Sequence, residues 1–127
     1  MDGKFHDKCF VCGKKHKKGL KLEFRLVNNT ISGEFRVPED YQGYDDILHG
    51  GIIAAILDSS MVNLFYLKEG MELKTAKLNV RYKKQIPIET KFTVIASAGE
   101  KIRKFSTAKS QIKINNMVYA EAEGYFK

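Results

Sequence analysis

Apolar and polar residues alternate along much of the chain, and this alternation predicts strands. From residue 20 to 26, leucine or phenylalanine fills every even position, while positions 21, 23 and 25 are charged. The sequence NNTISG at residues 28–33 turns the chain, and the odd positions from Ile31 to Val37 then alternate with polar residues. A period of two is typical of a strand with one buried face, so the two runs are expected to pair as a hairpin.

The same period returns in the second half of the chain. Apolar or small residues occupy alternate positions in four runs, at residues 76–82, 92–98, 108–114 and 118–126. Asn115 and Asn116 separate the last two runs and predict a tight turn. The pattern predicts an α+β fold with about six strands in a largely antiparallel sheet and one helix, and residues 1–127 are expected to form a single domain.

The expected helix has apolar residues on nearly every side. Between Ile52 and Leu67, isoleucine, alanine, leucine, methionine, valine and phenylalanine surround almost the whole cylinder. A helix of this kind is buried on most sides, so a curved sheet is expected to wrap it. Gly50 and Gly51 come at its start, where they leave the first backbone N–H groups uncovered for a ligand.

Asp58 is the one acid in this apolar helix. An enclosed carboxylate loses hydration, so it must find hydrogen-bond donors or take up a proton. A purely structural interpretation has Asp58 bonded to Ser59, Ser60 or a neighbouring strand, or turned to solvent. A functional interpretation makes it a base whose strength is tuned by burial. The structural interpretation does not account for the two glycines.

Gly51 and Asp58 lie on one face of the predicted helix. Seven residues separate them, which corresponds to roughly 10 Å along the axis. The Gly51 N–H and the Asp58 carboxylate of one chain are therefore too far apart to act on the same substrate carbonyl. In a two-fold dimer with antiparallel helices, each site would take its N–H donor from one subunit and its acid from the other.

The charge of the chain favours an anionic partner without identifying it. The 22 Lys and Arg residues outnumber the 15 Asp and Glu residues, which gives a net charge of +7. Nucleic acid, acidic lipid and a phosphate-bearing cofactor all fit, and the KKHKK cluster at residues 14–18 is expected to be a solvated basic loop. The lysine-rich first twenty residues do not resemble a signal peptide, and the longest apolar run is too short to span a bilayer, so a cytoplasmic protein without a membrane partner is expected.

Three segments resemble hot-dog fold thioesterases of the phenylacetyl-CoA type. The most specific is HGGIIAAILD at residues 49–58, which resembles the signature that opens the family's central helix. CFVCGKKHKKGLKLEF at residues 9–24 resembles the start of many members, and TAKLNVRYKKQIP at residues 75–87 stands where the family's next strand follows the helix. The resemblance covers nearly the whole chain.

The resemblance implies a hot-dog fold, homodimers or homotetramers built as dimers of dimers, and hydrolysis of acyl-CoA thioesters. Asp58 matches the family's catalytic acid, which acts as a general base on water or attacks the thioester directly. The Gly51 N–H matches the oxyanion donor, and Gly50 completes the glycine pair. His49 matches the motif's histidine, a positioning residue, and Thr75 falls where some relatives carry a serine that orients water.

Coenzyme A enters this reaction only as part of the substrate, and no separate cofactor is expected. Its phosphates would suit basic residues at the mouth of the site. The candidates are Arg81, Lys83 and Lys84 at the end of the third predicted strand, and Arg103 and Lys104 at the start of the fifth.

The chain departs from the family pattern in two places. His16 and Lys17 stand where many relatives have Asn-Pro, and the proline that often follows the strand after the helix comes late, at Pro87. Both changes concern loops, so they put in doubt the shape of the acyl pocket and of the N-terminal segment rather than the acid and the glycines.

The N-terminal segment carries four potential zinc ligands. His6, Cys9, Cys12 and His16 are spaced H-x2-C-x2-C-x3-H. Four ligands so close in sequence would crowd one another, and relatives carry cysteines there without a general metal requirement. A reduced cysteine pair without metal is therefore the favoured interpretation.

Three functions remain open. The first is an acyl-CoA thioesterase that uses Asp58 and the Gly51 N–H, and the second is a non-catalytic acyl-CoA-binding protein on the same fold. The third is a small nucleic-acid-binding domain, favoured only by charge and not expected here.

Overall fold

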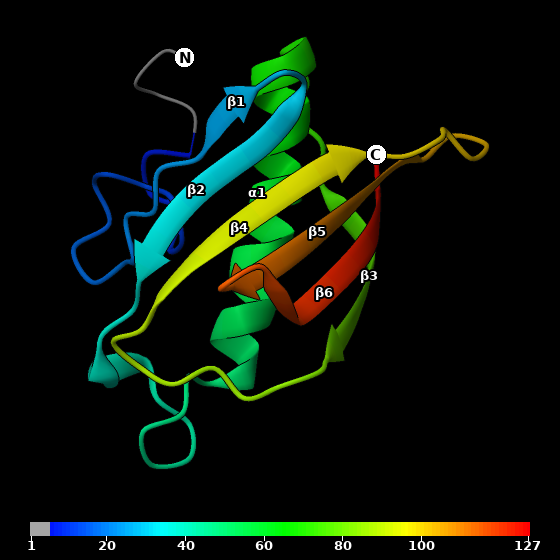
Figure 1. Cartoon of the computed structure of the whole chain (residues 1–127). Helices are drawn as coiled ribbons and strands as arrows, with labels where there is room; N and C mark the ends of the chain where they lie inside the picture. The colour runs from blue at the N-terminus through cyan, green and yellow to red at the C-terminus, as the bar shows by residue number, and fades with distance from the viewer. Residues whose placement is uncertain (1–5) are drawn as a thin grey trace.

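The computed structural model describes residues 6–127, which form one antiparallel sheet across one long helix (Figure 1). The strands are β1 (Arg25–Val27), β2 (Thr30–Arg36), β3 (Thr75–Tyr82), β4 (Lys91–Ala98), β5 (Ser106–Ile114) and β6 (Met117–Phe126). The helices are α1 (Gly50–Glu69) and a 3-10 turn, η1 (Glu39–Tyr41). The sheet has the order β1-β2-β4-β5-β6-β3, and all neighbours are antiparallel. The α+β prediction of six strands and one helix is confirmed.

Two asparagine pairs close the tight hairpins. Asn28 and Asn29 connect β1 to β2 with φ values of 50° and 65°, and Asn115 and Asn116 connect β5 to β6 with 50° and 67°. Both central residues of this two-residue turn need positive φ, which asparagine tolerates better than most residues. The turns set the register that directs alternate residues of β5 and β6 inward, where Ala108, Ile112, Ala120 and Phe126 are buried.

The first predicted strand is shorter than its sequence pattern. Only Arg25–Val27 joins the sheet, although Leu22 and Phe24 are buried as the pattern predicted. Lys21 adopts a positive φ of 55°, which breaks the extended run. The backbone N–H of Leu22 donates instead to the carbonyl of Val11 (2.8 Å), so residues 20–22 bond to the N-terminal segment rather than to the sheet.

The helix α1 is the centre of the core. Ile56, Leu57, Met61 and Leu64 are fully enclosed against the sheet, and Gly70 ends the helix in the left-handed conformation with a φ of 68°. By length and hydropathy alone α1 could cross a membrane, but 56% of that window is buried within the chain, and the core helix of a globular domain passes the same test.

Polar groups within the core are also paired. The Ser60 and Ser110 hydroxyls lie 2.6 Å apart and link α1 to β5, and Ser60 also donates to the carbonyl of Leu57 (2.6 Å). The amide of Asn63 donates to the carbonyl of Ser59 (2.8 Å). Every buried side-chain nitrogen or oxygen of the described residues has a partner.

Candidate active site

The face of α1 that carries Asp58 is the least covered part of the helix. Gly51 is exposed, and Ala55 and Asp58 are half-buried. Val62, one turn beyond Asp58 on the same face, is buried. The helix therefore presents the acid and its N-terminal turn on one accessible side.

Asp58 is held by Thr75, the first residue of β3. The Thr75 hydroxyl donates to Oδ1 of Asp58 at 2.6 Å. A register shift between Thr75 and Lys77, where β3 pairs with β6, accompanies this placement, and such irregularities re-aim side chains. The structure thus brings together the predicted acid and the predicted orienting hydroxyl.

Burial makes the Asp58 carboxyl a stronger base than an exposed aspartate. Desolvation raises its pKa above the ordinary value, and the hydrogen bond from Thr75 opposes that rise because it favours the ionised form. A carboxylate of raised pKa accepts a proton more readily, which suits a general base.

The N-terminus of α1 is capped by His49. The backbone N–H of Gly51 donates to Nδ1 of His49 at 2.8 Å, so the predicted oxyanion donor is engaged by the motif's own histidine. A Cβ at position 51 would lie 3.0 Å from the His49 ring, which explains why glycine suits this close approach. The carbonyl of Gly50 accepts from the Tyr82 hydroxyl at 2.7 Å, a contact that the sequence pattern did not suggest.

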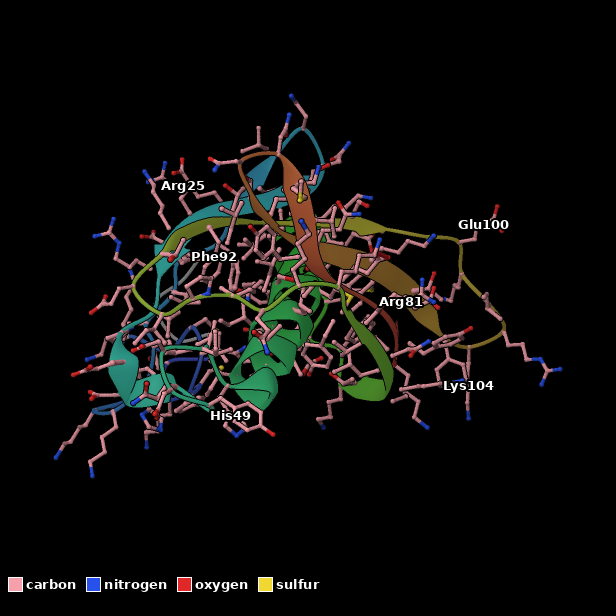
Figure 2. The ribbon with its side chains drawn as sticks, turned by 60° about the horizontal axis from the view of Figure 1, so that its bottom comes forward. Arg25, His49, Arg81, Phe92, Glu100 and Lys104 are labelled. Atoms are coloured by element: carbon pink, nitrogen blue, oxygen red, sulfur yellow. The ribbon has the colours of Figure 1, made fainter. Side chains whose placement is uncertain are left out.

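A shallow hollow adjoins this end of the helix. It has a volume of about 320 Å³, and its lining includes Gly43, Tyr44, Ile47, His49 and Gly50. Tyr44 is 83% exposed, so an aromatic side chain stands open to solvent beside the glycine pair. Figure 2 shows His49 at the start of α1, well away from the projecting loop that carries Glu100 and Lys104.

The five predicted coenzyme A contacts form two separate groups. Arg81, Lys83 and Lys84 lie where β3 ends, near the start of α1, while Arg103 and Lys104 lie in the loop before β5. The pairing of Thr75 and Ser106 with Phe126 places that loop beside the opposite end of β3. One chain therefore does not gather them into a single patch.

Three of these cations already have partners. Lys83 forms an ion pair with Glu121 at 2.8 Å and lowers the pKa of that carboxyl. The ammonium of Lys84 lies 5.7 Å from the centre of the Tyr119 ring, and that of Lys104 lies 5.6 Å from the centre of the Phe105 ring. These contacts are exposed and weak, so an anionic ligand could compete for the same cations.

A long helix across a six-stranded antiparallel sheet is the architecture of the hot-dog fold. The chain is 30% identical over 117 residues to acyl-coenzyme A thioesterase THEM4 of Mus musculus. The aligned region covers 87% of this chain and 50% of that protein. It thus spans about half the length of this curated relative. No protein-family model matches it.

Solved structures support the same fold. A thioesterase superfamily protein matches with a TM-score of 0.83 and 22% identity, over 92% of this chain and 61% of the other. Zebra fish thioesterase superfamily member 2 matches with a TM-score of 0.78 and 18% identity, over 96% and 92%. A putative thioesterase from Ralstonia eutropha, described as a phenylacetic acid degradation-related protein, matches with a TM-score of 0.74 and 15% identity, over 84% of each chain. The resemblance to hot-dog thioesterases is confirmed, and the phenylacetyl-CoA type stays a prediction.

Proposed function

We propose that this protein hydrolyses acyl-CoA thioesters and that Asp58 is its catalytic carboxylate. The observation that carries the proposal is the half-buried Asp58 carboxylate, which has a raised pKa, is bonded to Thr75 and lies on the accessible face of α1. The mouse relative's name, acyl-coenzyme A thioesterase, supports this substrate class.

The reaction needs a base, an oxyanion donor and a leaving thiolate. Acting as a base, Asp58 takes a proton from water while the water oxygen bonds to the thioester carbon. The carbon–sulfur bond then breaks, and the coenzyme A thiolate leaves and receives a proton. Direct attack by the Asp58 carboxylate, followed by hydrolysis of the resulting anhydride, needs the same position and remains the other route.

The Gly51 N–H is the proposed oxyanion donor. Its hydrogen bond to His49 keeps that N–H in a fixed direction until a substrate carbonyl takes the place of the imidazole nitrogen. The partial positive charge at the helix N-terminus then stabilises the negative charge that develops on the carbonyl oxygen. His49 is a positioning residue in this scheme.

A second copy of the chain is proposed to complete each site. About 10 Å of axial rise separates Gly51 from Asp58 in one helix, too far for both to act on the same carbonyl. The accessible helix face and the edge strand β3, whose Leu78 and Val80 are only half-buried, are the surfaces offered to that copy. We propose a homodimer, or a dimer of dimers, with antiparallel α1 helices.

This two-fold arrangement would also bring the two groups of cationic side chains together at one site. Pairing the Gly51 end of one chain with the Asp58 region of the other sets the Arg81 group of one subunit toward the Arg103 group of its mate. Together they would face the phosphates of coenzyme A, mostly through point-charge contacts from lysine.

The test is release of free thiol from a panel of short, medium, long and aromatic acyl-CoAs. Hydrolysis with a clear chain preference supports the proposal and measures the acyl pocket. Tight binding of the same acyl-CoAs without thiol release would instead indicate the non-catalytic acyl-CoA-binding protein. Neither binding nor release would contradict both.

Thr75 provides a pH-dependent prediction. Thr75→Val removes the hydrogen bond that favours ionised Asp58, so the pKa of Asp58 rises further. The base form is then lost at a higher pH, and the acidic limb of the kcat/KM profile should move to higher pH. Thr75→Ser keeps a hydroxyl and should retain the wild-type limb; an unshifted limb in Thr75→Val would exclude this role for the threonine.

A further inference from the structure

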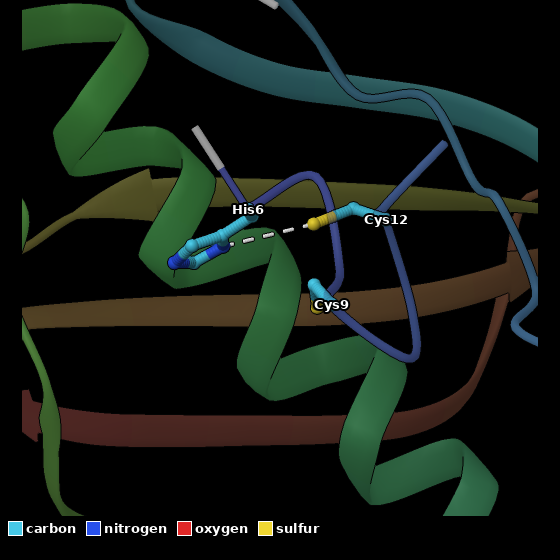
Figure 3. A group of neighbouring side chains, drawn as sticks. All are labelled: His6, Cys9 and Cys12. Carbon is cyan, nitrogen blue, oxygen red and sulfur yellow. Dashed lines mark hydrogen bonds between the residues drawn. The ribbon is translucent and has the colours of Figure 1, made fainter. Parts of the chain in front are cut away.

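A second cluster of chemically active side chains lies in the N-terminal segment, apart from the Asp58 site. The ligand atoms of His6, Cys9 and Cys12 all lie within 4.8 Å of one another, and all three residues are half-buried. Figure 3 shows the imidazole and the two thiols converging beside α1, with Nδ1 of His6 3.7 Å from Sγ of Cys12.

The backbone of this segment creates the convergence. The N–H of Cys9 donates to the carbonyl of His6, and the N–H of Gly13 donates to that of Cys9, each at 2.9 Å. The first bond closes a turn between His6 and Cys9, and the second closes a turn that encloses Cys12, so the three ligands come together. A Cβ at Gly13 would lie 2.4 Å from the Asp7 carbonyl oxygen, so the tight path depends on glycine at that position.

The spacing of the ligand atoms suits a tetrahedral ion. With zinc–sulfur bonds of about 2.3 Å and zinc–nitrogen bonds of about 2.0–2.1 Å, tetrahedral angles place a sulfur and a nitrogen ligand roughly 3.6 Å apart. The 3.7 Å between Sγ of Cys12 and Nδ1 of His6 agrees with this spacing. Small side-chain movements would bring the remaining pairs to it.

His16, the fourth residue of the sequence pattern, is not part of this group. Its Nδ1 accepts the backbone N–H of Lys18 at 3.2 Å, and its ring packs edge-on against Phe10 with 5.7 Å between the ring centres. The crowding expected of four ligands so close in sequence is thereby relieved, since three residues converge and one turns away.

A contact from α1 supports one of the two thiols. Cys9 and Cys12 are free thiols. The amide of Asn63 on α1 donates to Sγ of Cys12 at 3.6 Å, the kind of outer contact that supports a thiolate ligand.

We propose that His6, Cys9 and Cys12 bind one Zn²⁺ ion, with the fourth tetrahedral position open to water or an added ligand. The ion holds the N-terminal segment in the shape that packs on α1, where Cys12 is bonded to Asn63 and the neighbouring Val11 is buried in the core. Its role is structural and independent of hydrolysis at Asp58.

The test is metal content and Co²⁺ spectroscopy of the full chain. Protein purified without chelator should carry about one zinc per chain, and the reduced apoprotein should bind one Co²⁺ with thiolate-to-cobalt charge-transfer bands and intense tetrahedral d–d bands. His6→Ala and Cys9→Ser should each lose most of this binding. His16→Ala is the matched control and should keep it.

Three results would overturn the proposal. They are wild-type protein that binds no more Co²⁺ than a Cys9→Ser/Cys12→Ser double variant, full binding by His6→Ala, and an intramolecular Cys9–Cys12 disulfide in freshly purified protein. Should the double variant fail to fold, His6→Ala against His16→Ala still decides the matter, because neither replacement alters a thiol.

Discussion

The Asp58→Asn protein is expected to hydrolyse its preferred acyl-CoA about 10²–10⁴ times more slowly than the wild type, the range that a positioned general base contributes. Asparagine has nearly the same shape and can still accept the Thr75 hydrogen bond, but it cannot take a proton from water. The measurement is kcat and KM from thiol release. We expect the loss in kcat, with substrate binding kept.

The same replacement should not weaken the fold. Because burial raises the folded-state pKa of Asp58 above its unfolded value, the free energy of unfolding falls as the pH rises from the unfolded to the folded pKa. Ionised Asp58 therefore costs stability at neutral pH, and Asp58→Asn should melt at or above the wild-type temperature. Glu69→Gln, at the exposed end of α1, is the matched control and should keep full activity. Full activity of Asp58→Asn would falsify the proposed role of the acid.

Mixing two inactive variants is expected to restore activity if each site spans two chains. Asp58→Asn lacks the acid, and Gly51→Pro lacks the backbone N–H. Proline is tolerated in the first turn of a helix, and the His49 ring, 3.0 Å from a Cβ at this position, moves aside because its cap is lost. In a mixed dimer, one site carries both defects and the other carries none. Random exchange makes about half of the dimers mixed, so total activity should recover to about a quarter of wild type.

A site contained within one chain would give no recovery. Gly50→Pro controls for the proline itself, because it falls at the first helical position after an extended residue, His49 with ψ of 132°, and leaves the Gly51 N–H in place. A Cβ at Gly50 would meet Tyr82 at 3.6 Å, an ordinary contact. Sedimentation of the wild type as a stable monomer at micromolar concentration would contradict the shared site independently.

The alternation of apolar residues predicted the strands, because residues two positions apart on a strand lie on the same face of the sheet and one face is buried. Phe92, Val94 and Ala96 are buried in succession on β4 as predicted. The pattern failed at Lys21, where a positive φ turns the chain while Leu22 and Phe24 still reach the core. Burial and strand pairing are separate properties, and periodicity reports only the first.

The candidate site was predictable in its residues and less so in its contacts. The spacing of Gly51 and Asp58 follows from helical geometry, so their shared face could be derived from the sequence. The hydrogen bonds of Gly51 to His49 and of Gly50 to Tyr82 could not, because they depend on one side-chain rotamer and on where β3 ends. Nothing in periodicity carries that information.

The buried Ser60–Ser110 hydroxyl pair has a consequence for the direction in which the acid points. When a helix is apolar on nearly all sides, its rotations about its own axis bury similar apolar areas, so burial alone favours none of them. The Ser60 hydroxyl keeps its bond to Leu57 at every rotation, but the enclosed Ser110 hydroxyl, 2.6 Å away, is paired with it only when Ser60 faces β5. Asp58 lies two residues before Ser60, about 200° around the axis, so locking the serine toward β5 turns the carboxylate outward. The hydroxyl pair therefore fixes the rotation of α1 about its own axis.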